Sequence, residues 1–429
     1  MRPSPAIGGR MGVPGDKSIS HRALMLGAMA RGSTRVHGFL EAADCLATRD
    51  ALRALGVNIE GPADAAVSIE GVGLRGFRKP PGVLDLGNSG TAMRLLAGLL
   101  AGQDFDCTLA GDASLCRRPM ERVAEPLRRM GADVRTSSGV APLFIRGGRA
   151  LSGVHYRMPV ASAQVKSALL LAGLNARGET CIEEPAPTRD HTERMLRAFG
   201  CSVDCGPRGV CIDGSQALEA CDIEVPGDFS SAAFFIVAAC IGAGPSLEIE
   251  NVGVNRTRTG LLEALSQMGA DIALLRPRRA GNEPVADIRV KPARLRGISV
   301  PPALVPAMID ELPVLLIAAA RADGQTLVSG ARELRVKESD RIAAMAAGLR
   351  ALGAAVTETP DGLRIEGGNL RGGSVDACGD HRVAMAFAVA GAVAEEPVEI
   401  RGVSCVATSY PGFVTAATEA GIDIRAMDA

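Results

Sequence analysis

Tryptophan is absent from this 429-residue chain, and aromatic residues of all kinds make up only 3% of it. The two tyrosines are Tyr156 and Tyr410. This scarcity argues against base-stacking platforms and aromatic sugar-binding clefts. A charge excess is also lacking, because 47 basic residues face 48 acidic ones and the net charge is -1. Without a global positive field the chain does not hold nucleic acid or an anionic membrane nonspecifically. Any anion that binds must therefore be bound by local groups.

Lysine is scarce among the basic residues. Five of the 47 are lysines, so 47 − 5 = 42 are arginines. The lysines are Lys17, Lys79, Lys166, Lys291 and Lys337. An arginine stays protonated, whereas a lysine ammonium is compact and can transfer a proton. Each lysine is therefore a candidate for a position that needs a compact ammonium able to transfer a proton.

Paired cysteine motifs and long apolar runs are missing too. The eleven cysteines are an odd number, form no CxxC pair and have no metal-ligand spacing. We therefore expect reduced structural thiols and no metal. The longest apolar runs, such as 232–241, fall short of the roughly 20 residues that a membrane span requires. The opening MRPSPAIGGR has no apolar signal core, which predicts a soluble cytoplasmic protein.

One short phrase recurs six times along the chain. It reads LRALGVNI at 52, LRRMGADV at 127, LRAFGCSV at 196, LSQMGADI at 265, LRALGAAV at 349 and ATEAGIDI at 417. Each copy predicts the last turn of an amphipathic helix, a glycine with positive φ that ends it, and a strand. The mean spacing of the six glycines is (421 − 56)/5 = 73 residues. This period predicts six α/β units, which divide into three plus three.

A second similarity between two stretches of the sequence indicates where the two sets of units divide. VPGDFSSAAFF at 225–235 resembles VPGDKSISHRA at 13–23, and in both a Pro-Gly-Asp turn precedes serines that can cap an apolar helix. A chain of this length also favours at least two domains. We expect an N-terminal domain at 14–226 and a C-terminal domain formed by 1–13 and 227–429.

Several predicted helix starts in the first half carry anion-binding groups. In GDKSISHRALML at 15–26, Ser18 or Ser20 is expected to cap a helix that has Lys17 and Arg22 at the same end. A solvated helix start explains this motif equally well. In LGNSGTAMRLLAG at 86–98, the glycines permit close backbone approach to a small ligand. Each motif alone is weak evidence.

Further helix starts follow the same design. In RRPM at 117–120 the proline can open a helix, and Arg118 can hold a phosphate or carboxylate bidentately. Cys116 nearby lacks the base that a nucleophile needs. SAQVKSALLLAGL at 162–174 predicts a capped helix with Ser162, Gln164 and Lys166 in its first turn. In TRDHTERML at 188–196, His191 and Glu193 are two residues apart and do not share a helix face, which favours a polar cap over a metal pair.

The second half repeats charged helix starts. AMIDELPVLLIAAA at 307–320 places Asp310 and Glu311 at the start of an apolar helix, where the helix dipole alone accounts for acidic residues. RVKESDRIAAM at 335–345 sets Lys337 beside Glu338, a pair that can share a proton in a cleft. GDHRVAMAFAVAG at 379–391 has Arg382 at a helix start. Together these local cations in a chain of near-zero charge predict a cleft between two domains that grips a polyanionic small molecule.

Eight of these motifs, in this order over almost the whole chain, resemble 5-enolpyruvylshikimate-3-phosphate synthase, also called 3-phosphoshikimate 1-carboxyvinyltransferase. They are PGDKSISHRA, LGNSGTAMRLLAG, GDASLCRRPM, SAQVKSALLLAGL, TRDHTERML, NRTRTG, RVKESDRI and GDHRVAMAF. The resemblance implies an α/β fold of two similar domains, each of three βαβαββ-type units, forming an inside-out α/β barrel with the active site in the interdomain cleft. It implies transfer of the enolpyruvyl group from phosphoenolpyruvate to the 5-hydroxyl of shikimate 3-phosphate, with release of phosphate. No metal or organic cofactor is implied, and we expect a monomer.

The resemblance also implies roles for individual residues. The expected shikimate 3-phosphate contacts are Ser18, Arg22, Ser162, Ala163, Gln164 and Arg189. The expected phosphoenolpyruvate contacts are Lys17, Gly90, Arg118, Lys337, Arg341 and Arg382. Asp310 is the expected base for the 5-hydroxyl proton. Lys337 and Glu338 are candidates for giving a proton to the methylene carbon and removing one from the resulting methyl group, while Lys17 suits the departing phosphate.

The chain departs from the family pattern at three places. Thr408 stands where some members have a lysine that contacts phosphate, and His191 stands where many have a tyrosine near the shikimate ring. The GDK, SAQVK, RDHTE and NRTR motifs resemble class II members, which can tolerate glyphosate. That tolerance is associated with alanine where this chain has Gly90, so we predict that glyphosate competes with phosphoenolpyruvate.

Two alternatives to this interpretation remain at this point. UDP-N-acetylglucosamine enolpyruvyl transferase shares the fold and the donor, but its loop cysteine lies several residues ahead of its Arg-Pro pair, whereas Cys116 is two residues before Arg118. A non-catalytic anion-binding module explains the charged helix starts but leaves Asp310 and the Lys337–Glu338 pair without a purpose.

Overall fold

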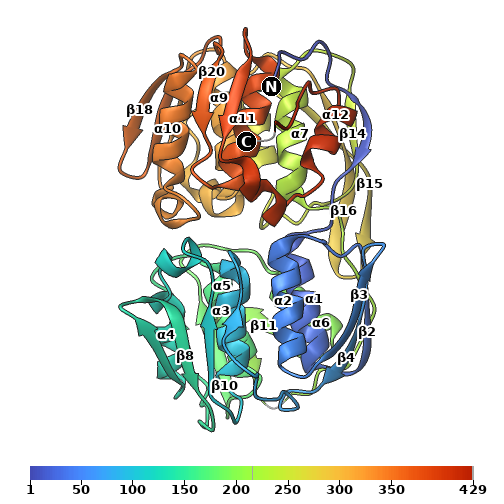
Figure 1. Cartoon of the computed structure of the whole chain (residues 1–429), viewed down its shortest axis with the longest axis vertical. Helices are drawn as coiled ribbons and strands as arrows, with labels where there is room; N and C mark the ends of the chain where they lie inside the picture. Colours follow the sequence, from blue (N-terminus) through green and yellow to red (C-terminus); the bar gives the residue numbers. More distant parts are fainter. Residues whose placement is uncertain (215, 428–429) are drawn as a thin grey trace. The chain divides into compact units, whose positions relative to one another are not determined.

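The computed structural model describes residues 1–214 and 216–427 and divides into two compact units. The N-terminal unit comprises Gly15–Val225 and Ala280–Glu283. The C-terminal unit comprises Met1–Pro14, Pro226–Arg279 and Pro284–Ala429. The chain crosses between them at Pro14/Gly15 and at Val225/Pro226, and sequence reasoning does not predict that residues 280–283 join the N-terminal unit. Each unit is described by itself below (Figure 1).

The N-terminal unit contains three successive repeats. The first has α1 (Lys17–Met29), β2 (Arg31–His37), α2 (Ala43–Ala54), β3 (Asn58–Ala63) and β4 (Ala66–Val72). The second has β5 (Leu84–Asp85), α3 (Gly90–Leu100), β6 (Cys107–Ala110), η1 (Leu115–Arg117), α4 (Glu121–Arg129), β7 (Asp133–Ser137) and β8 (Val140–Arg146). The third has β9 (His155–Arg157), α5 (Ala163–Gly173), β10 (Glu179–Glu183), α6 (His191–Ala198), β11 (Asp204–Gly206) and β12 (Gly209–Asp213), and β13 (Ile223–Glu224) follows.

Each N-terminal repeat forms one four-stranded sheet with the same topology. The strand orders are β13-β2-β4-β3, β5-β6-β8-β7 and β9-β10-β12-β11. In every sheet the first two strands are parallel and the other pairs antiparallel. The second and third repeats therefore read βαβαββ. The first repeat lacks its own first strand, and β13 from the end of the unit takes that place.

The C-terminal unit repeats this plan less completely. Its elements are β1 (Gly9–Gly12), α7 (Phe229–Ile241), β14 (Leu247–Gly253), α8 (Gly260–Gln267), β15 (Asp271–Ala280), β16 (Glu283–Lys291), η2 (Pro302–Met308), α9 (Leu312–Arg321), β17 (Gln325–Val328), η3 (Arg332–Val336), α10 (Arg341–Ala351), β18 (Ala355–Thr359), β19 (Gly362–Glu366), β20 (Gly373–Asp376), α11 (His381–Val393), β21 (Val398–Arg401), η4 (Val403–Thr408) and α12 (Phe413–Glu419).

The three sheets of this unit become smaller along the chain. The first has the order β1-β14-β16-β15, and β1 supplies the parallel first strand. The second has β17-β19-β18, with isolated parallel bridges at Arg296–Asp323 and Ser299–Leu327 where a first strand would lie. The third consists of β20 and β21, and no strand follows α12 in the described chain up to residue 427. The sixth repeat therefore has no closing hairpin among these residues.

The six recurring glycines end helices as the sequence predicts. Their φ values lie between 82° and 98°. At the first of them, Gly56 donates its amide to Arg53 O and Val57 donates to Leu52 O, which is the Schellman motif. The same two bonds recur at the other five glycines. A strand follows five of the six, and the expectation of a strand is wrong after the sixth.

The helices sort into two kinds by burial. Nearly every residue of α1, α3, α5, α7, α9 and α11 is buried, whereas α4 and α12 bury one face. A helix that is apolar all round must lie inside a core. Figure 1 shows α1, α3 and α5 between β8 on one side of the N-terminal unit and β2 and β4 on the other. The sheets therefore lie outside and the helices inside, and the expected α/β class is confirmed.

Two further observations concern the helices. A Cβ atom at Gly98 of α3 would lie 2.1 Å from Ala168 O, so glycine is what lets α3 and α5 approach so closely. No helix of the described residues is long and apolar enough to cross a membrane.

The expectation that all cysteines are reduced is wrong, because Cys181 and Cys211 form a disulfide between directly facing positions of β10 and β12. Sequence spacing does not reveal this pair, which the strand register creates.

Candidate active site

In the N-terminal unit, side chains tie together the first turns of α1, α3, α5 and α6. Gln164 Nε2 donates to Thr91 Oγ1 at 2.9 Å, which joins α5 to α3. Arg22 Nη2 donates to Ser167 Oγ at 2.7 Å, and Arg22 Nε donates to Thr192 Oγ1 at 2.7 Å. The first turn of a helix has unsatisfied N–H groups and the positive end of the dipole. Four such ends at one place make a site suited to an anion.

Side-chain caps fix where three of these helices begin. Asp16 caps α1, Ser89 caps α3 and Ser162 caps α5, each accepting a hydrogen bond from the amide three residues on. The expectation that Ser18 or Ser20 caps α1 is therefore wrong, although the cap on α5 is as expected. Because Asp16 takes the cap, the Ser18 hydroxyl is left to accept a bond from Arg189 Nη1 at 3.5 Å.

Arg22 is a buried cation of this group. Its side chain is buried, and Nη1 donates to Ser18 O at 2.9 Å. Burial lowers the pKa of Arg22 to about 10, and nearby Glu193 opposes that shift while Arg189 adds to it. The guanidinium thus stays charged at neutral pH. Arg22 and Arg189 together present two cations beside the Ser18 hydroxyl.

The start of α3 gathers a second pair of arginines. A Cβ atom at Gly90 would lie 3.0 Å from Arg94 Nη1 and 3.2 Å from Arg118 Nη1. Arg94 donates to Gln164 Oε1 at 2.6 Å, and Arg118 donates to Asn88 O at 3.2 Å. The helix that Pro119 was expected to open begins later, at Glu121, so Arg118 lies at the end of η1 instead.

Two lysines of this unit have carboxylate partners. Lys17 Nζ forms an ion pair with Asp44 of α2. Lys166 Nζ lies 2.8 Å from Glu184 and 2.7 Å from Glu193, and its side chain is 1% exposed. Burial alone would lower the pKa of Lys166, but the two carboxylates outweigh it and raise the pKa. Lys166 is therefore part of an internal ion cluster and is not a residue that contacts substrate.

His191 and Glu193 point to different partners, as expected of a polar cap and not of a metal pair. His191 Nδ1 lies 2.8 Å from Glu283 Oε1, and both side chains are buried. Glu283 belongs to the 280–283 segment, which Arg194 Nη1 also holds by donating to Asn282 O at 2.9 Å. Sequence reasoning does not find this contact, because 92 residues separate its partners.

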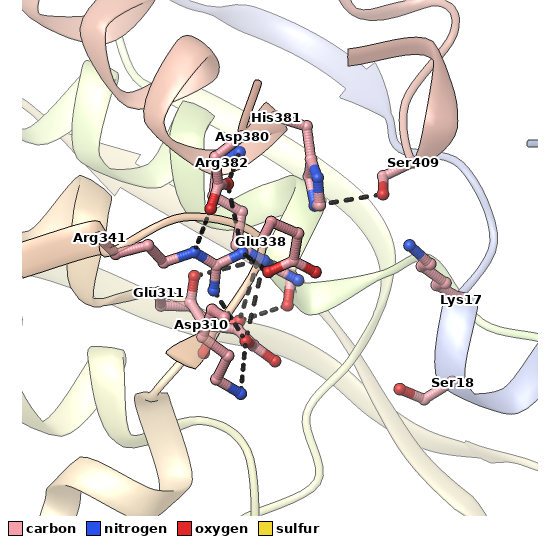
Figure 2. A network of polar contacts seen from close by, with 12 residues as sticks. Lys17, Ser18, Asp310, Glu311, Glu338, Arg341, Asp380, His381, Arg382 and Ser409 are labelled. Atoms are coloured by element: carbon pink, nitrogen blue, oxygen red, sulfur yellow. Dashed lines mark hydrogen bonds and ion pairs between the residues drawn. The ribbon is translucent and has the colours of Figure 1, made fainter. Parts of the chain in front are cut away.

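In the C-terminal unit, the start of α9 carries a carboxylate that faces three cations (Figure 2). Asp310 Oδ1 lies 3.7 Å from Lys337 Nζ, 3.2 Å from Arg341 Nη1 and 3.9 Å from Arg382 Nε. Arg382 Nη1 also donates to Asp310 O at 3.0 Å. These side chains come from four separate stretches of one unit, at the starts of α9, α10 and α11 and the end of η3. Asp340 and Asp380 cap α10 and α11.

Arg341 lies at the centre of this group and has no exposed surface. Nε donates to Asp380 Oδ2 at 2.7 Å, and Nη2 donates to Glu338 Oε2 at 2.7 Å. Burial alone would lower the pKa of Arg341, but Asp380, Glu338 and Asp310 raise it. In return Arg341 keeps the pKa of Asp380 below its ordinary value, although burial alone would raise it. The network in Figure 2 fixes Glu338 and Asp310 on one rigid guanidinium.

The remaining predicted contact, near residue 408, has a local role. Thr408 Oγ1 donates to Cys405 O at 2.7 Å, within its own turn. The neighbouring Ser409, directly after η4, has its Oγ 3.2 Å from Nε2 of His381, the first residue of α11 (Figure 2). That one phosphate contact is missing or replaced here stays a prediction.

The sequence-predicted residues fall into two groups, one in each unit. The N-terminal group is Lys17, Ser18, Arg22, Gly90, Arg118, Ser162, Ala163, Gln164 and Arg189. The C-terminal group is Asp310, Lys337, Glu338, Arg341 and Arg382. Sequence reasoning missed Arg94, which lies against Gly90 and Gln164. The signal was a single arginine inside an otherwise apolar helix, which a buried polar role explains.

Known proteins resemble this chain over nearly its whole length. Residues 1–416 match the family model described as EPSP synthase (3-phosphoshikimate 1-carboxyvinyltransferase). A 3-phosphoshikimate 1-carboxyvinyltransferase of Alkalilimnicola ehrlichii is 58% identical over 431 residues, covering 100% of this chain and 97% of the relative. One of Methylococcus capsulatus is 59% identical over 423 residues, covering 97% of each.

Solved structures give the same result. EPSP synthase from Acinetobacter baumannii has a TM-score of 0.89 and 51% identity, covering 100% of this chain and 99% of the other. The enolpyruvyl transferase NikO from Streptomyces tendae has a TM-score of 0.82 at 19% identity, covering 100% and 98%, which supports the fold alone. The family model, the full-length relatives and the solved EPSP synthase structure agree, and the chain belongs to the EPSP synthase (3-phosphoshikimate 1-carboxyvinyltransferase) family.

Proposed function

We propose that this chain transfers the enolpyruvyl group of phosphoenolpyruvate to the 5-hydroxyl of shikimate 3-phosphate, and that the two residue groups described above serve this one reaction. The activity is that of the family to which the chain belongs. The products are 5-enolpyruvylshikimate 3-phosphate and phosphate, which places the enzyme in the shikimate pathway of aromatic amino acid biosynthesis.

The N-terminal group is assigned to shikimate 3-phosphate. Ser18, Arg22 and Arg189 form a hydroxyl and two cations at the start of α1. Ser162, Ala163 and Gln164 form the cap and first turn of α5, whose free amides add further donors. A phosphate monoester accepts several charge-assisted hydrogen bonds, which such a cluster provides. Bonds to Ser167 and Thr192 hold Arg22 in position before substrate binds.

Phosphoenolpyruvate is assigned to the remaining cations. Lys17, Gly90 and Arg118 come from the N-terminal group, and Lys337, Arg341 and Arg382 from the C-terminal group. Planar guanidinium groups suit a carboxylate or phosphate held bidentately. The bonds to Asp380, Glu338 and Asp310 account for four of the five N–H groups of Arg341, so its main effect on the substrate is through the charges that it orients.

The proton transfers are assigned to Asp310, Lys337 and Glu338. In the addition step, a proton goes to the methylene carbon of phosphoenolpyruvate while the 5-hydroxyl oxygen attacks C2 and loses its proton. In the elimination step, the new methyl group loses a proton and the C–O bond to phosphate breaks. An acid and a base must therefore act at two ends of one bound pair. The carboxylate of Asp310 and the ammonium of Lys337, 3.7 Å apart, supply groups of both kinds.

The observation that carries this proposal is the Asp310 carboxylate among Lys337, Arg341 and Arg382, since a simple anion-binding module has no use for a carboxylate there. Purified chain is mixed with shikimate 3-phosphate and phosphoenolpyruvate, and phosphate release is followed. Asp310→Asn is expected to release phosphate at least about 100-fold more slowly. Release with UDP-N-acetylglucosamine and none with shikimate 3-phosphate would contradict the proposal. The cytoplasmic location and monomeric state stay predictions, and light scattering of the purified chain tests the second.

A further inference from the structure

We propose that the outer face of the third sheet, formed by β9, β10, β12 and β11, carries a binding site for a soft divalent cation such as Zn²⁺, with Cys181, Cys211, Glu179 and His155 as ligands. The site is separate from both groups of residues assigned to the reaction. It forms when the Cys181–Cys211 disulfide is reduced.

Strand register places the four ligands side by side. Cys181 of β10 pairs with Cys211 of the antiparallel β12 and with His155 of the parallel β9. Glu179 lies two residues before Cys181 on β10, so its side chain leaves the same face of the sheet. The two sulfur atoms and a carboxylate oxygen of Glu179 all lie within 4.8 Å of one another, whereas the ring nitrogens of His155 lie outside this group, so the imidazole must turn toward it to serve as the fourth ligand. One ion with bonds of about 2.0 to 2.3 Å spans nearly that distance.

This face of the sheet points away from the protein core. Thr180 and Ile182, the alternate residues of β10, are fully buried, and Ile182 belongs to the hydrophobic cluster of the unit while the two cysteines do not. Cys181 and Cys211 are nevertheless only 4% and 2% exposed. Two buried sulfurs under exposed His155 and Glu179 side chains make a small site that solutes can reach from one side.

The donor set selects the kind of ion. Two thiolates favour Zn²⁺ and related soft cations over Mg²⁺ or Ca²⁺, and one imidazole with one carboxylate completes a tetrahedral set. A dithiol that reduces the disulfide transfers two electrons and two protons and is itself oxidised to a disulfide. Binding Zn²⁺ then releases the two thiol protons to the buffer.

Arg208 is the group that competes with the cation. It lies on the turn between β11 and β12 and holds Glu179 through two hydrogen bonds of 2.6 and 3.0 Å. Both side chains are largely exposed, and such surface pairs contribute little free energy. An ion can therefore take Glu179 from Arg208, and Arg208→Gln is expected to strengthen metal binding.

The test is Co²⁺ titration of the full-length chain after reduction with dithiothreitol and anaerobic removal of the reductant. We expect one equivalent of Co²⁺ to bind, with thiolate-to-cobalt charge-transfer absorption in the near ultraviolet and the visible bands of tetrahedral cobalt. Zn²⁺ should displace it. Cys181→Ser and Cys211→Ser are expected to abolish the charge-transfer band or to weaken binding at least about 100-fold, and Glu179→Gln about 10-fold.

Cys205→Ser is the matched control, because Cys205 lies on β11 of the same sheet and pairs with Val210, so its side chain leaves the opposite face. It should bind Co²⁺ like the parent chain. Reduced parent chain whose absorption does not exceed that of Cys181→Ser would overturn the proposal. Equal affinity of parent chain, Glu179→Gln and Arg208→Gln would overturn the assigned ligand set, and these surface variants leave the fold intact. Phosphate release by every variant reports that the chain is folded.

Discussion

Gly90→Ala is the substitution that most directly tests the proposed phosphoenolpyruvate contacts. The new Cβ would lie 3.0 Å from Arg94 Nη1 and 3.2 Å from Arg118 Nη1. Ordinary van der Waals contact begins at 3.4 Å, so the two guanidinium groups must withdraw by about 3.4 − 3.0 = 0.4 and 3.4 − 3.2 = 0.2 Å. Gly90 is the first residue of α3 and its φ is not positive, so alanine introduces no backbone strain.

The size of the effect follows from what the arginines lose. A hydrogen bond to a charged group contributes about 1.5–3 kcal/mol, and we expect a displaced Arg118 to lose about half of one such bond to phosphoenolpyruvate. A loss of about 1.4 kcal/mol corresponds to a tenfold change. The KM for phosphoenolpyruvate should therefore rise about three- to tenfold, while the KM for shikimate 3-phosphate stays within about twofold. Inhibition by glyphosate, which we predict to compete with phosphoenolpyruvate, should weaken as well.

Steady-state kinetics with each substrate varied in turn measures this split. Gly82→Ala is the matched control, because a Cβ atom there meets nothing within 4 Å. Urea unfolding should give a free energy of unfolding within about 1 kcal/mol of the parent chain for both variants, since alanine is the better helix former at position 90 and a Cβ atom at position 82 meets no neighbouring atom. An unchanged KM for phosphoenolpyruvate in folded Gly90→Ala would refute the assignment of this helix start to that substrate.

Three further predictions follow from the lysines and from one buried histidine. Lys337→Arg keeps the charge near Asp310 but cannot release a proton, so kcat should fall about 100-fold or more. Lys166→Met leaves Glu184 and Glu193 without their buried cation and should lower the free energy of unfolding by about 3–5 kcal/mol. Burial holds the pKa of His21 well below 6.5, aided by Lys17, so the unfolded state takes up a proton that the folded state refuses. The free energy of unfolding should therefore fall below pH 6.5 by up to about 1.4 kcal/mol per pH unit, and His21→Gln should flatten that slope.

Each of these has an outcome that would count against it. Near-normal kcat in Lys337→Arg would make Lys337 an electrostatic anchor only. For Lys166→Met the control is Lys291→Met, whose exposed partner Asp271 lies 3.6 Å away and whose loss should cost less than about 1 kcal/mol. Equal losses in the two variants would contradict the burial argument. An identical pH slope in the parent chain and His21→Gln would assign the slope to other groups.

Local features of the fold could be predicted from the sequence because their causes are local. The glycine stop needs only a helix and a residue that accepts positive φ, and all six stops formed. The cap of α1 shows the limit of this reasoning. Asp16 and Ser18 are both good caps, and only the observed start of the helix at Lys17 decides for Asp16.

Contacts between segments far apart in the chain could not be predicted from the sequence. Nothing in the local pattern joins His191 to Glu283, or Cys181 to Cys211, because sheet register and the path of the 280–283 segment create these pairs. Arg94 was missed for a related reason, since its partner Gln164 lies 70 residues away on another helix. The resemblance supplied most of the site residues, and their partners came from the structure.

The five lysines show how burial refines an argument from composition. Scarcity made all five candidates for proton transfer, but a group must also reach the substrate. Lys166 has a 1% exposed side chain and two carboxylate partners, so its compact ammonium serves an internal ion cluster. Lys291 lies in an exposed surface pair. Lys337, 30% exposed and 3.7 Å from Asp310, combines access with a neighbouring carboxylate that can exchange protons. Partial exposure beside a second titratable group therefore selects Lys337 over Lys166 and Lys291, which the count of lysines alone could not separate from it.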